Sequence, residues 1–197
     1  MTEIYFVRHA QPDLNVSNNY TRPLTEIGRK DAHKLCEFLK DIKFAAFYSS
    51  TYLRSYETIL ELASYQNKKI IKIENLKERL YGKRKDKIED FFKKQWNDFS
   101  YKNEDGESLN DVIFRNVNEI NKLLKKHANE RILIGYHGTN LCALLSYYTS
   151  NFNYYNFLEI KPLLPLVVKM VFDNDKFVDY EMIYSVKRDY LDIEKLI

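Results

Sequence analysis

Ile4-Tyr5-Phe6-Val7-Arg8-His9-Ala10-Gln11, close to the amino terminus, joins an unbroken apolar run to an arginine and a histidine. A short continuous run of β-branched and aromatic residues is typical of a strand covered on both faces of a sheet. Open α/β sheets bind ligands beyond the carboxyl ends of such strands, where Arg8 and His9 would lie. A buried guanidinium is costly without an anion, and its planar fork suits a phosphate or a carboxylate. The segment alone leaves two interpretations open: a strand that simply leaves the core through polar residues, or an anion site. The rest of the sequence decides between them.

Length and composition favour one compact α/β domain. The chain has 197 residues, of which 45% are hydrophobic and 15% aromatic, so it can bury a sizeable core and is not typical of a disordered chain. The formal net charge of +3 is too small to indicate nucleic acid as a partner. Cys36 and Cys142 both fall on apolar-periodic stretches, and we interpret them as small core side chains.

Targeting and metal-binding patterns are absent from the sequence. No apolar run is long enough to cross a bilayer, and the amino terminus lacks the basic region of a signal peptide. We therefore expect a cytoplasmic protein without membrane contact. The histidines and cysteines form no zinc-binding pattern, so we expect neither a metal nor a cofactor.

A second buried strand, over 44–48, leads into two serines and then a helix over about 51–63, with Ser50 as its expected N-cap. Arg54 falls near the amino end of this helix, where a cation opposes the helix dipole at a cost of roughly 0.3–1 kcal/mol. The position becomes favourable if an anion binds between Arg54 and the N–H groups of the helix start. The alternative is a surface arginine paired with a nearby glutamate.

Two further strand ends carry polar side chains. The strand over 69–73 precedes Glu78, which is either a well-placed carboxylate or one charge among many in a surface loop. The strand over 131–136 ends in His137 and Gly138, and a helix follows directly. Gly138 would let the backbone approach a ligand closely at the amino end of that helix.

Two consecutive helical stripes, within 83–101 and over 108–126, have no strand between them. They predict a small helical cap, over about 83–128, packed over the edge of the sheet. The lysines of the first stripe are interpreted as its solvated face, because the aromatic residues share the opposite face. A nucleic-acid patch over 83–94 is the alternative.

The other segments are a loop, a helix and a hairpin. A polar loop over 11–22 has the length and position of a binding loop, and Thr25 is the expected N-cap of the helix that follows it. After a proline-containing loop, the chain is predicted to end in a hairpin with strands over 166–172 and 176–184.

The carboxyl ends of parallel strands lie along one edge of a sheet. Arg8-His9, Ser49-Ser50 with Arg54, and His137-Gly138 would therefore converge, and all three suit phosphate binding. The predicted fold class is α/β: a three-layer αβα sandwich with a mostly parallel central sheet and a small helical cap, in one domain over residues 1–197.

These residues resemble the motifs of the histidine phosphatase superfamily, which has the phosphoglycerate mutase-like fold, over most of the chain. Ala10 stands where the family usually has a glycine, and Tyr136 where a serine is frequent. Besides the three strand ends, the resemblance includes several shorter matches: Asn15, Pro23-Leu24-Thr25 with Gly28, Glu78 with Gly82, and Gly106-Glu107-Ser108.

The resemblance implies a role for each site residue. His9 would be the nucleophile and form a phosphohistidine. Arg8, Arg54 and His137 would hold the phosphoryl oxygens and neutralise the charge that develops in the transition state. Glu78 would protonate the leaving alcohol and then activate water. Further contacts to substrate would come from Asn15, Tyr81 and Gly138, with Tyr20, Arg22 and Lys83 as additional candidates for the pocket wall.

The implied activity is that of a metal-independent phosphomonoesterase acting through a phosphohistidine on a small phosphorylated metabolite. Phosphoglycerate mutase is the alternative enzyme, because residues 78–82 resemble the mutase form of this segment. A non-catalytic phospholigand-binding module is the alternative from another class. The expected partner is a small-molecule substrate, with no nucleic acid and no membrane; a homodimer stays open, because the sequence does not specify an oligomeric state.

Overall fold

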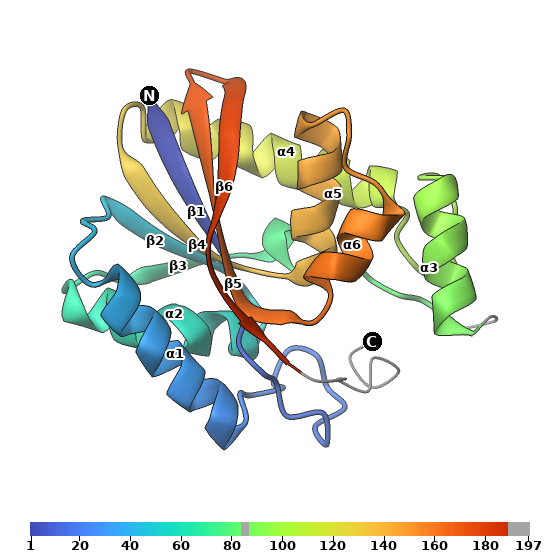
Figure 1. The fold of residues 1–197 in the computed structure, drawn as a ribbon, viewed down its shortest axis with the longest axis horizontal. Helices are drawn as coiled ribbons and strands as arrows, with labels where there is room; N and C mark the ends of the chain where they lie inside the picture. Colours follow the sequence, from blue (N-terminus) through green and yellow to red (C-terminus); the bar gives the residue numbers. More distant parts are fainter. Residues whose placement is uncertain (84–86, 189–197) are drawn as a thin grey trace.

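One sheet organises the described part of the chain, residues 1–83 and 87–188 of a computed structural model (Figure 1). Its strand order is β3-β2-β4-β1-β5-β6. Strands β3, β2, β4 and β1 pair in parallel, whereas β5 is antiparallel to β1 and β6 to β5. The strands are β1 (Thr2–Arg8), β2 (Ala46–Ser50), β3 (Ile70–Ile73), β4 (Arg131–Tyr136), β5 (Leu163–Asp173) and β6 (Lys176–Lys187).

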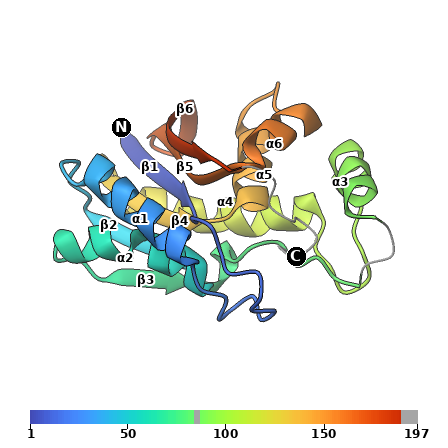
Figure 2. The same ribbon diagram turned by 60° about the horizontal axis from the view of Figure 1, so that its bottom comes forward.

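Helices cover both faces of this sheet (Figures 1 and 2). Helices α1 and α2 pack on one face, and α4 and α5 on the other. The helical elements are α1 (Glu26–Leu39), α2 (Leu53–Tyr65), the 3₁₀ turn η1 (Glu74–Leu76), α3 (Ile88–Asn97), α4 (Leu109–Lys126), α5 (Gly138–Tyr148) and α6 (Tyr154–Ile160).

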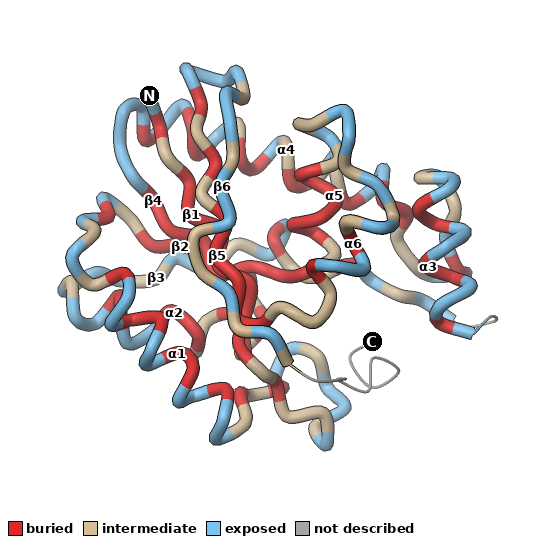
Figure 3. Tube along the Cα trace, in the orientation of Figure 1, coloured by how far each residue is buried: buried red, intermediate tan, exposed pale blue. Residues whose placement is uncertain are grey.

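The unbroken apolar run of β1 follows from this layering. Successive strand side chains point to opposite faces, so Tyr5 and Val7 pack with α1 and α2, whereas Ile4 and Phe6 pack with α4 and α5. Figure 3 shows β1, β2, β4 and β5 as the buried centre of the molecule. The predicted three-layer α/β fold with a mostly parallel sheet is confirmed.

The two helices expected to form the cap have different places. Helix α4 runs along one face of the sheet in both ribbon views, and its Ile120, Leu123 and Leu124 are buried in a hydrophobic cluster with sheet residues (Figures 1 and 2). Helix α3 lies away from the sheet, beyond α5 and α6, in both ribbon views (Figures 1 and 2). The expectation of a two-helix cap is therefore corrected: the apolar stripe of α4 continues along the face of the sheet, and α3 alone lies outside the layers.

Two local predictions were wrong. Ser50 is not the N-cap of α2, which begins after Tyr52 without a side-chain cap; the Ser50 hydroxyl accepts a bond from the Tyr52 N–H instead (3.0 Å). Helix α6 was expected to be loop. Its first turn is closed by a capping box between Asn153 and Asn156, which the proline-rich context of the segment obscured.

Several local predictions hold. Thr25 caps α1 by accepting the N–H of Gly28 (3.0 Å), and α1 runs so close to the first strand's exit that a Cβ on Gly28 would lie 2.3 Å from the Gln11 carbonyl oxygen. The apolar stripe of α3 is buried, which favours a solvated face for its lysines. Residues 84–86 of the alternative nucleic-acid patch lie outside the described residues. Among the helices described, none is long and apolar enough to cross a membrane.

Candidate active site

The strand ends converge as the sequence predicts. Strand β4 lies between β1 and β2, and Arg8 is in register with Tyr136. His9 and His137, the next residues of the two adjacent strands, therefore lie at the same edge of the sheet. Their ring centroids are 5.4 Å apart. From the end of β2, the Ser50 hydroxyl lies 2.7 Å from Nε2 of His137.

A cavity of about 810 Å³, counted with its open mouth, lies at this edge. Its lining combines charged side chains with apolar ones from α3 and α6, namely Phe92, Phe157 and Ile160. Six of the predicted site residues line it: Arg8, His9, Arg54, Glu78, Tyr81 and Gly138.

His9 presents a free ring nitrogen. Its Nδ1 is 2.8 Å from the Ala10 carbonyl oxygen, which can only accept, so Nδ1 carries the hydrogen and Nε2 keeps its lone pair. Burial, together with the charges of Arg54 and Arg8, lowers the pKa of His9 well below 6.5. The Ala10 N–H donates to Thr58 (3.0 Å), which fixes the backbone beside the ring. The imidazole is therefore neutral at pH 7 and has the protonation state of a nucleophile.

His137 is fully buried behind this cavity, not in its lining. Ser50 accepts the Tyr52 N–H, so its own hydroxyl hydrogen can donate to Nε2 of His137. The Ser55 hydroxyl also lies near Nε2, at 3.1 Å; with Ser50 at 2.7 Å as the donor, the ring hydrogen is on Nδ1, which has no partner among the described residues. Burial, with the charge of Arg54, lowers the pKa of His137 well below 6.5. His137 is thus a neutral donor beside His9.

Arg8 and Arg54 are both held by backbone oxygens. Nη1 of Arg8 donates to the carbonyls of Ile160 (2.8 Å), Lys161 (3.1 Å) and Leu163 (2.9 Å). Nη1 of Arg54 donates to the Asn19 carbonyl (3.0 Å). The Nε atoms of both arginines are buried without a partner among the described residues. Each of the two guanidinium groups therefore keeps at least its Nε–H for a ligand.

Gly138 is required by this packing. A Cβ at that position would lie 2.8 Å from Cζ of Arg8, because the start of α5 passes directly over the guanidinium. The close approach that Gly138 permits in this structure is that of the Arg8 guanidinium; its predicted contact with a ligand stays a prediction.

Glu78 reaches the cavity from the segment after η1. Its two carboxylate oxygens accept the backbone N–H groups of Arg79 (2.8 Å) and Thr139 (3.2 Å). These bonds hold the carboxylate at the start of α5, among the residues that line the cavity. Glu78 is therefore a carboxyl group available to a molecule in the cavity.

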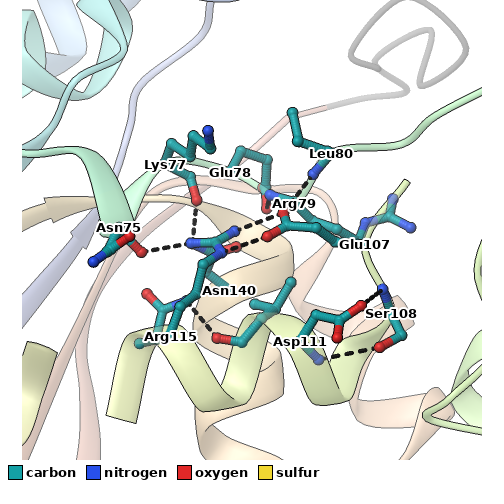
Figure 4. A network of polar contacts seen from close by, with 12 residues as sticks. Asn75, Lys77, Glu78, Arg79, Leu80, Glu107, Ser108, Asp111, Arg115 and Asn140 are labelled. Atoms are coloured by element: carbon teal, nitrogen blue, oxygen red, sulfur yellow. Dashed lines mark hydrogen bonds and ion pairs between the residues drawn. The ribbon is translucent and has the colours of Figure 1, made fainter. Parts of the chain in front are cut away.

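The segment that carries Glu78 is anchored by an ion pair (Figure 4). Arg115 of α4 binds Glu107 with two nitrogens, at 2.7 and 3.0 Å, and donates to the Asn75 carbonyl (2.6 Å). Glu107 also accepts the Leu80 N–H (2.8 Å). A bidentate pair of this kind is geometrically specific, so it fixes the chain on both sides of Glu78.

Asn15 is, besides His137, the other predicted site residue that does not line the cavity. It is exposed, and its N–H donates to the Asp13 side chain (3.0 Å). Asn19, four residues later in the same loop, lines the cavity instead. The prediction for Asn15 is corrected because the loop turns at Asp13 and points that side chain to solvent.

Three cations near the site were not assigned roles from the sequence. Arg22 was only a candidate for the wall, yet it is buried and its charge lowers the pKa of both His9 and Arg54. Arg79 and Lys161 line the cavity. A buried position for Arg22 could have been suspected from its place directly before the Pro23-Leu24-Thr25 match; nothing in the sequence indicates the positions of the other two.

Metal ligands are not gathered here. Within residues 1–83 and 87–188, no group of three or more His, Cys, Asp or Glu side chains could hold a metal ion. The charges that face the cavity are mainly those of guanidinium groups.

The fold and the site define an α/β enzyme that handles phosphoryl groups. The family model of the histidine phosphatase superfamily (branch 1) matches residues 4–179, and the chain belongs to this superfamily. Together with relatives named as phosphatases, this places the chain among the phosphoric monoester hydrolases.

The chain is similar to several known proteins. It is 30% identical over 162 residues to a metal-independent phosphoserine phosphatase of Arabidopsis thaliana, covering 73% of this chain and 67% of that one. It is also 30% identical over 162 residues to a phosphoglycerate mutase of Schizosaccharomyces pombe, covering 72% and 77%. The solved structure of Bacillus stearothermophilus YhfR is 26% identical with a TM-score of 0.73, covering 90% of this chain and 95% of that one.

The lowered pKa values predict how stability changes with pH. Below pH 6.5 an unfolded chain protonates both histidines while the folded chain keeps them neutral, so stability falls as the pH falls. Each histidine contributes a slope of up to about 1.4 kcal/mol per pH unit between about pH 6 and pH 5. We expect urea unfolding to show this slope, and His137→Gln to reduce it.

Carboxyl groups change stability at lower pH than the two histidines do. The contribution of the histidines can therefore be measured separately. Hydrogen bonds lower the pKa of Glu74 to about 2, from an ordinary value of 4.5, so its contribution is lost only at more acidic pH. An unchanged slope in His137→Gln would contradict the assignment of a buried neutral imidazole.

Proposed function

We propose that the protein is a metal-independent phosphomonoesterase that works through a phosphohistidine on His9. The observation that carries the proposal is the set of unpartnered N–H groups, from Arg8, Arg54 and His137, around an imidazole whose Nε2 is free. Buried donors without acceptors are unfavourable, and a phosphoryl group supplies the acceptor oxygens that they lack.

The first half-reaction forms the phosphohistidine. Nε2 of His9 attacks phosphorus, the N–P bond forms, and the P–O bond to the substrate alcohol breaks. The two arginines and His137 stabilise the negative charge on the phosphoryl oxygens. A proton from the Glu78 carboxyl group passes to the leaving oxygen, so an alcohol departs and Glu78 becomes a carboxylate.

The second half-reaction releases phosphate. The Glu78 carboxylate takes a proton from a water molecule as that water attacks phosphorus. The N–P bond breaks, and its electron pair returns to Nε2 of His9. The neutral imidazole and the protonated Glu78 are regenerated, which closes the cycle without a metal ion.

The substrate is proposed to be a small phosphorylated metabolite. The cavity is lined both by charged groups such as Arg8 and Arg54 and by aromatic rings such as Phe92, which suits a small molecule with one phosphate group. The relatives named for phosphoserine support a small substrate. The relative named as a phosphoglycerate mutase supports the alternative. In that reaction the phosphoryl group on His9 is transferred back to a phosphoglycerate and not to water.

Removal of the nucleophile tests the mechanism. We expect the purified protein to hydrolyse p-nitrophenyl phosphate in the presence of EDTA, and His9→Ala to lower kcat by at least about a thousandfold, because the covalent step is lost. His33→Ala, on the exposed side of α1, is the matched control and should retain full activity. Full turnover by His9→Ala would remove His9 from the mechanism.

The role of Glu78 is tested with two leaving groups. Glu78→Gln cannot supply the proton, so hydrolysis of an alkyl phosphate should fall by about 10²–10⁴ in kcat. The first step with p-nitrophenyl phosphate should fall much less, because p-nitrophenolate leaves without protonation. The measurement is the pre-steady-state release of each alcohol. Equal losses for both substrates would indicate that Glu78 acts in some other way.

A further inference from the structure

One carboxylate outside the cavity lining joins three segments that carry site residues. Glu74, the first residue of η1, accepts hydrogen bonds from the Tyr20 hydroxyl and the Thr51 hydroxyl, each at 2.7 Å. Nζ of Lys77 donates to the same carboxylate (2.9 Å). The three donors belong to the polar loop over 11–22, to the junction of β2 and α2, and to the segment after η1. The proposed mechanism uses none of these contacts.

The Glu74 carboxylate is charged at neutral pH. Burial raises its pKa, but the hydrogen bonds from Lys77, Tyr20 and Thr51 outweigh this effect and lower the pKa to about 2. Hydrogen bonds to a charged acceptor are stronger than those between neutral groups. Because two of the three donors are hydroxyl groups, Glu74 makes more than a surface ion pair, although its side chain is half exposed.

The loop that carries Tyr20 is folded around Arg22. Nε of this buried arginine donates to the Val16 carbonyl (2.8 Å), and its Nη2 donates to the Ser17 carbonyl (3.3 Å). The Arg22 N–H donates to the Asn18 carbonyl, and the Tyr20 N–H donates to the Asn18 side chain, both at 2.9 Å. A displacement of Tyr20 would therefore also move its neighbours in the loop.

Tyr20 lies next to the contact that holds Arg54. The Tyr20 ring centroid is 4.8 Å from that of Tyr52, and the Tyr20 carbonyl accepts the Leu53 N–H (3.0 Å). The preceding carbonyl, that of Asn19, accepts from Nη1 of Arg54 (3.0 Å). The orientation of this guanidinium therefore depends on where the loop is held.

We propose that Glu74 is a positioning residue for Arg54. By holding Tyr20, Glu74 keeps the Asn19 carbonyl in place, and this carbonyl orients the guanidinium toward the phosphoryl group. The inference rests on the proposed phosphatase function and adds to it a residue that does not touch the substrate. Nε of Arg54 has no partner among the described residues, and a small rotation of the guanidinium would turn its N–H away from a bound oxyanion.

Single substitutions measure the contribution of the contact. Tyr20→Phe removes the hydroxyl but keeps the ring on Tyr52, and it should lower kcat/KM for p-nitrophenyl phosphate by about three- to tenfold. Glu74→Ala should lower it at least as much, whereas Glu74→Gln can still accept from Tyr20 and should retain most of the activity. Glu37→Ala is the matched control, because it breaks an exposed pair with Lys40 of the same spacing (2.8 Å), and it should change nothing.

A double-mutant cycle connects the effect to Arg54. Arg54→Lys removes the guanidinium, including the Nη1 that binds the Asn19 carbonyl. If Tyr20 acts through that bond, Tyr20→Phe should lower kcat/KM by less than about twofold in the Arg54→Lys background. A loss as large as in the wild-type background would show that the two residues act independently, and it would overturn the proposal.

Hydrogen exchange follows the loop without any turnover. The Leu53 N–H, which donates to the Tyr20 carbonyl, should exchange faster in Glu74→Ala and in Tyr20→Phe than in the wild-type protein, at an unchanged melting temperature. Unchanged exchange at Leu53 in both variants would contradict the claim that Glu74 holds the loop.

The two proposals fail in different ways. If the wild-type protein cleaves p-nitrophenyl phosphate and both Tyr20→Phe and Glu74→Ala retain its full kcat/KM, the positioning role is overturned and the phosphatase proposal stands. If the wild-type protein cleaves no phosphate ester, the phosphatase proposal itself fails, and the role assigned to Glu74 fails with it.

Discussion

The structure depends on burying positive charge beside a neutral histidine. Arg8 and Arg54 are each less than one-tenth exposed, and each retains an N–H without a partner among the described residues. Such an arrangement is unfavourable in the unliganded protein, because a desolvated cation needs an acceptor. It becomes favourable when an oxyanion binds, and it also keeps His9 unprotonated. Burial lowers the pKa of His9 most, and the two charges that would bind the oxyanion lower it further.

The fold compensates for this cost with backbone oxygens. Three carbonyls between the end of α6 and the start of β5 accept from Arg8, and the Asn19 carbonyl accepts from Arg54. Each arginine is thereby fixed without a carboxylate, which would have competed with the substrate for it. The ion pair of Glu107 with Arg115 performs the corresponding task for the segment that carries Glu78, and it lies outside the cavity lining.

Much of this arrangement could be predicted from the sequence, because the relevant signals are local. Apolar runs that end in polar residues locate the strand ends, and the register of parallel strands then brings His9 and His137 together. The strand over 131–136 and the cap at Thr25 were predicted at their observed positions. The direction in which a loop side chain points is harder to predict from the sequence. Asn15 and Asn19 are equally polar, and only the turn at Asp13 decides which of them faces the cavity.

Contacts between distant segments could not be predicted. Arg79 and Lys161 are far apart in the chain, and only the packing of α3 against α6 brings both to one aromatic ring. The layer occupied by α4 is a similar case, since an amphipathic stripe fits a cap as well as a sheet face. Amphipathicity shows that a helix has a buried side but does not identify its neighbour.

A crystal structure with vanadate bound would test the central claim most directly, because vanadate resembles the phosphoryl group in transit. The charge arrangement described above predicts vanadium bonded to Nε2 of His9, with its oxygens in contact with Arg8, Arg54 and His137. Vanadate bound elsewhere in the cavity, or held by only one of these groups, would contradict the claim that they act on a single oxyanion.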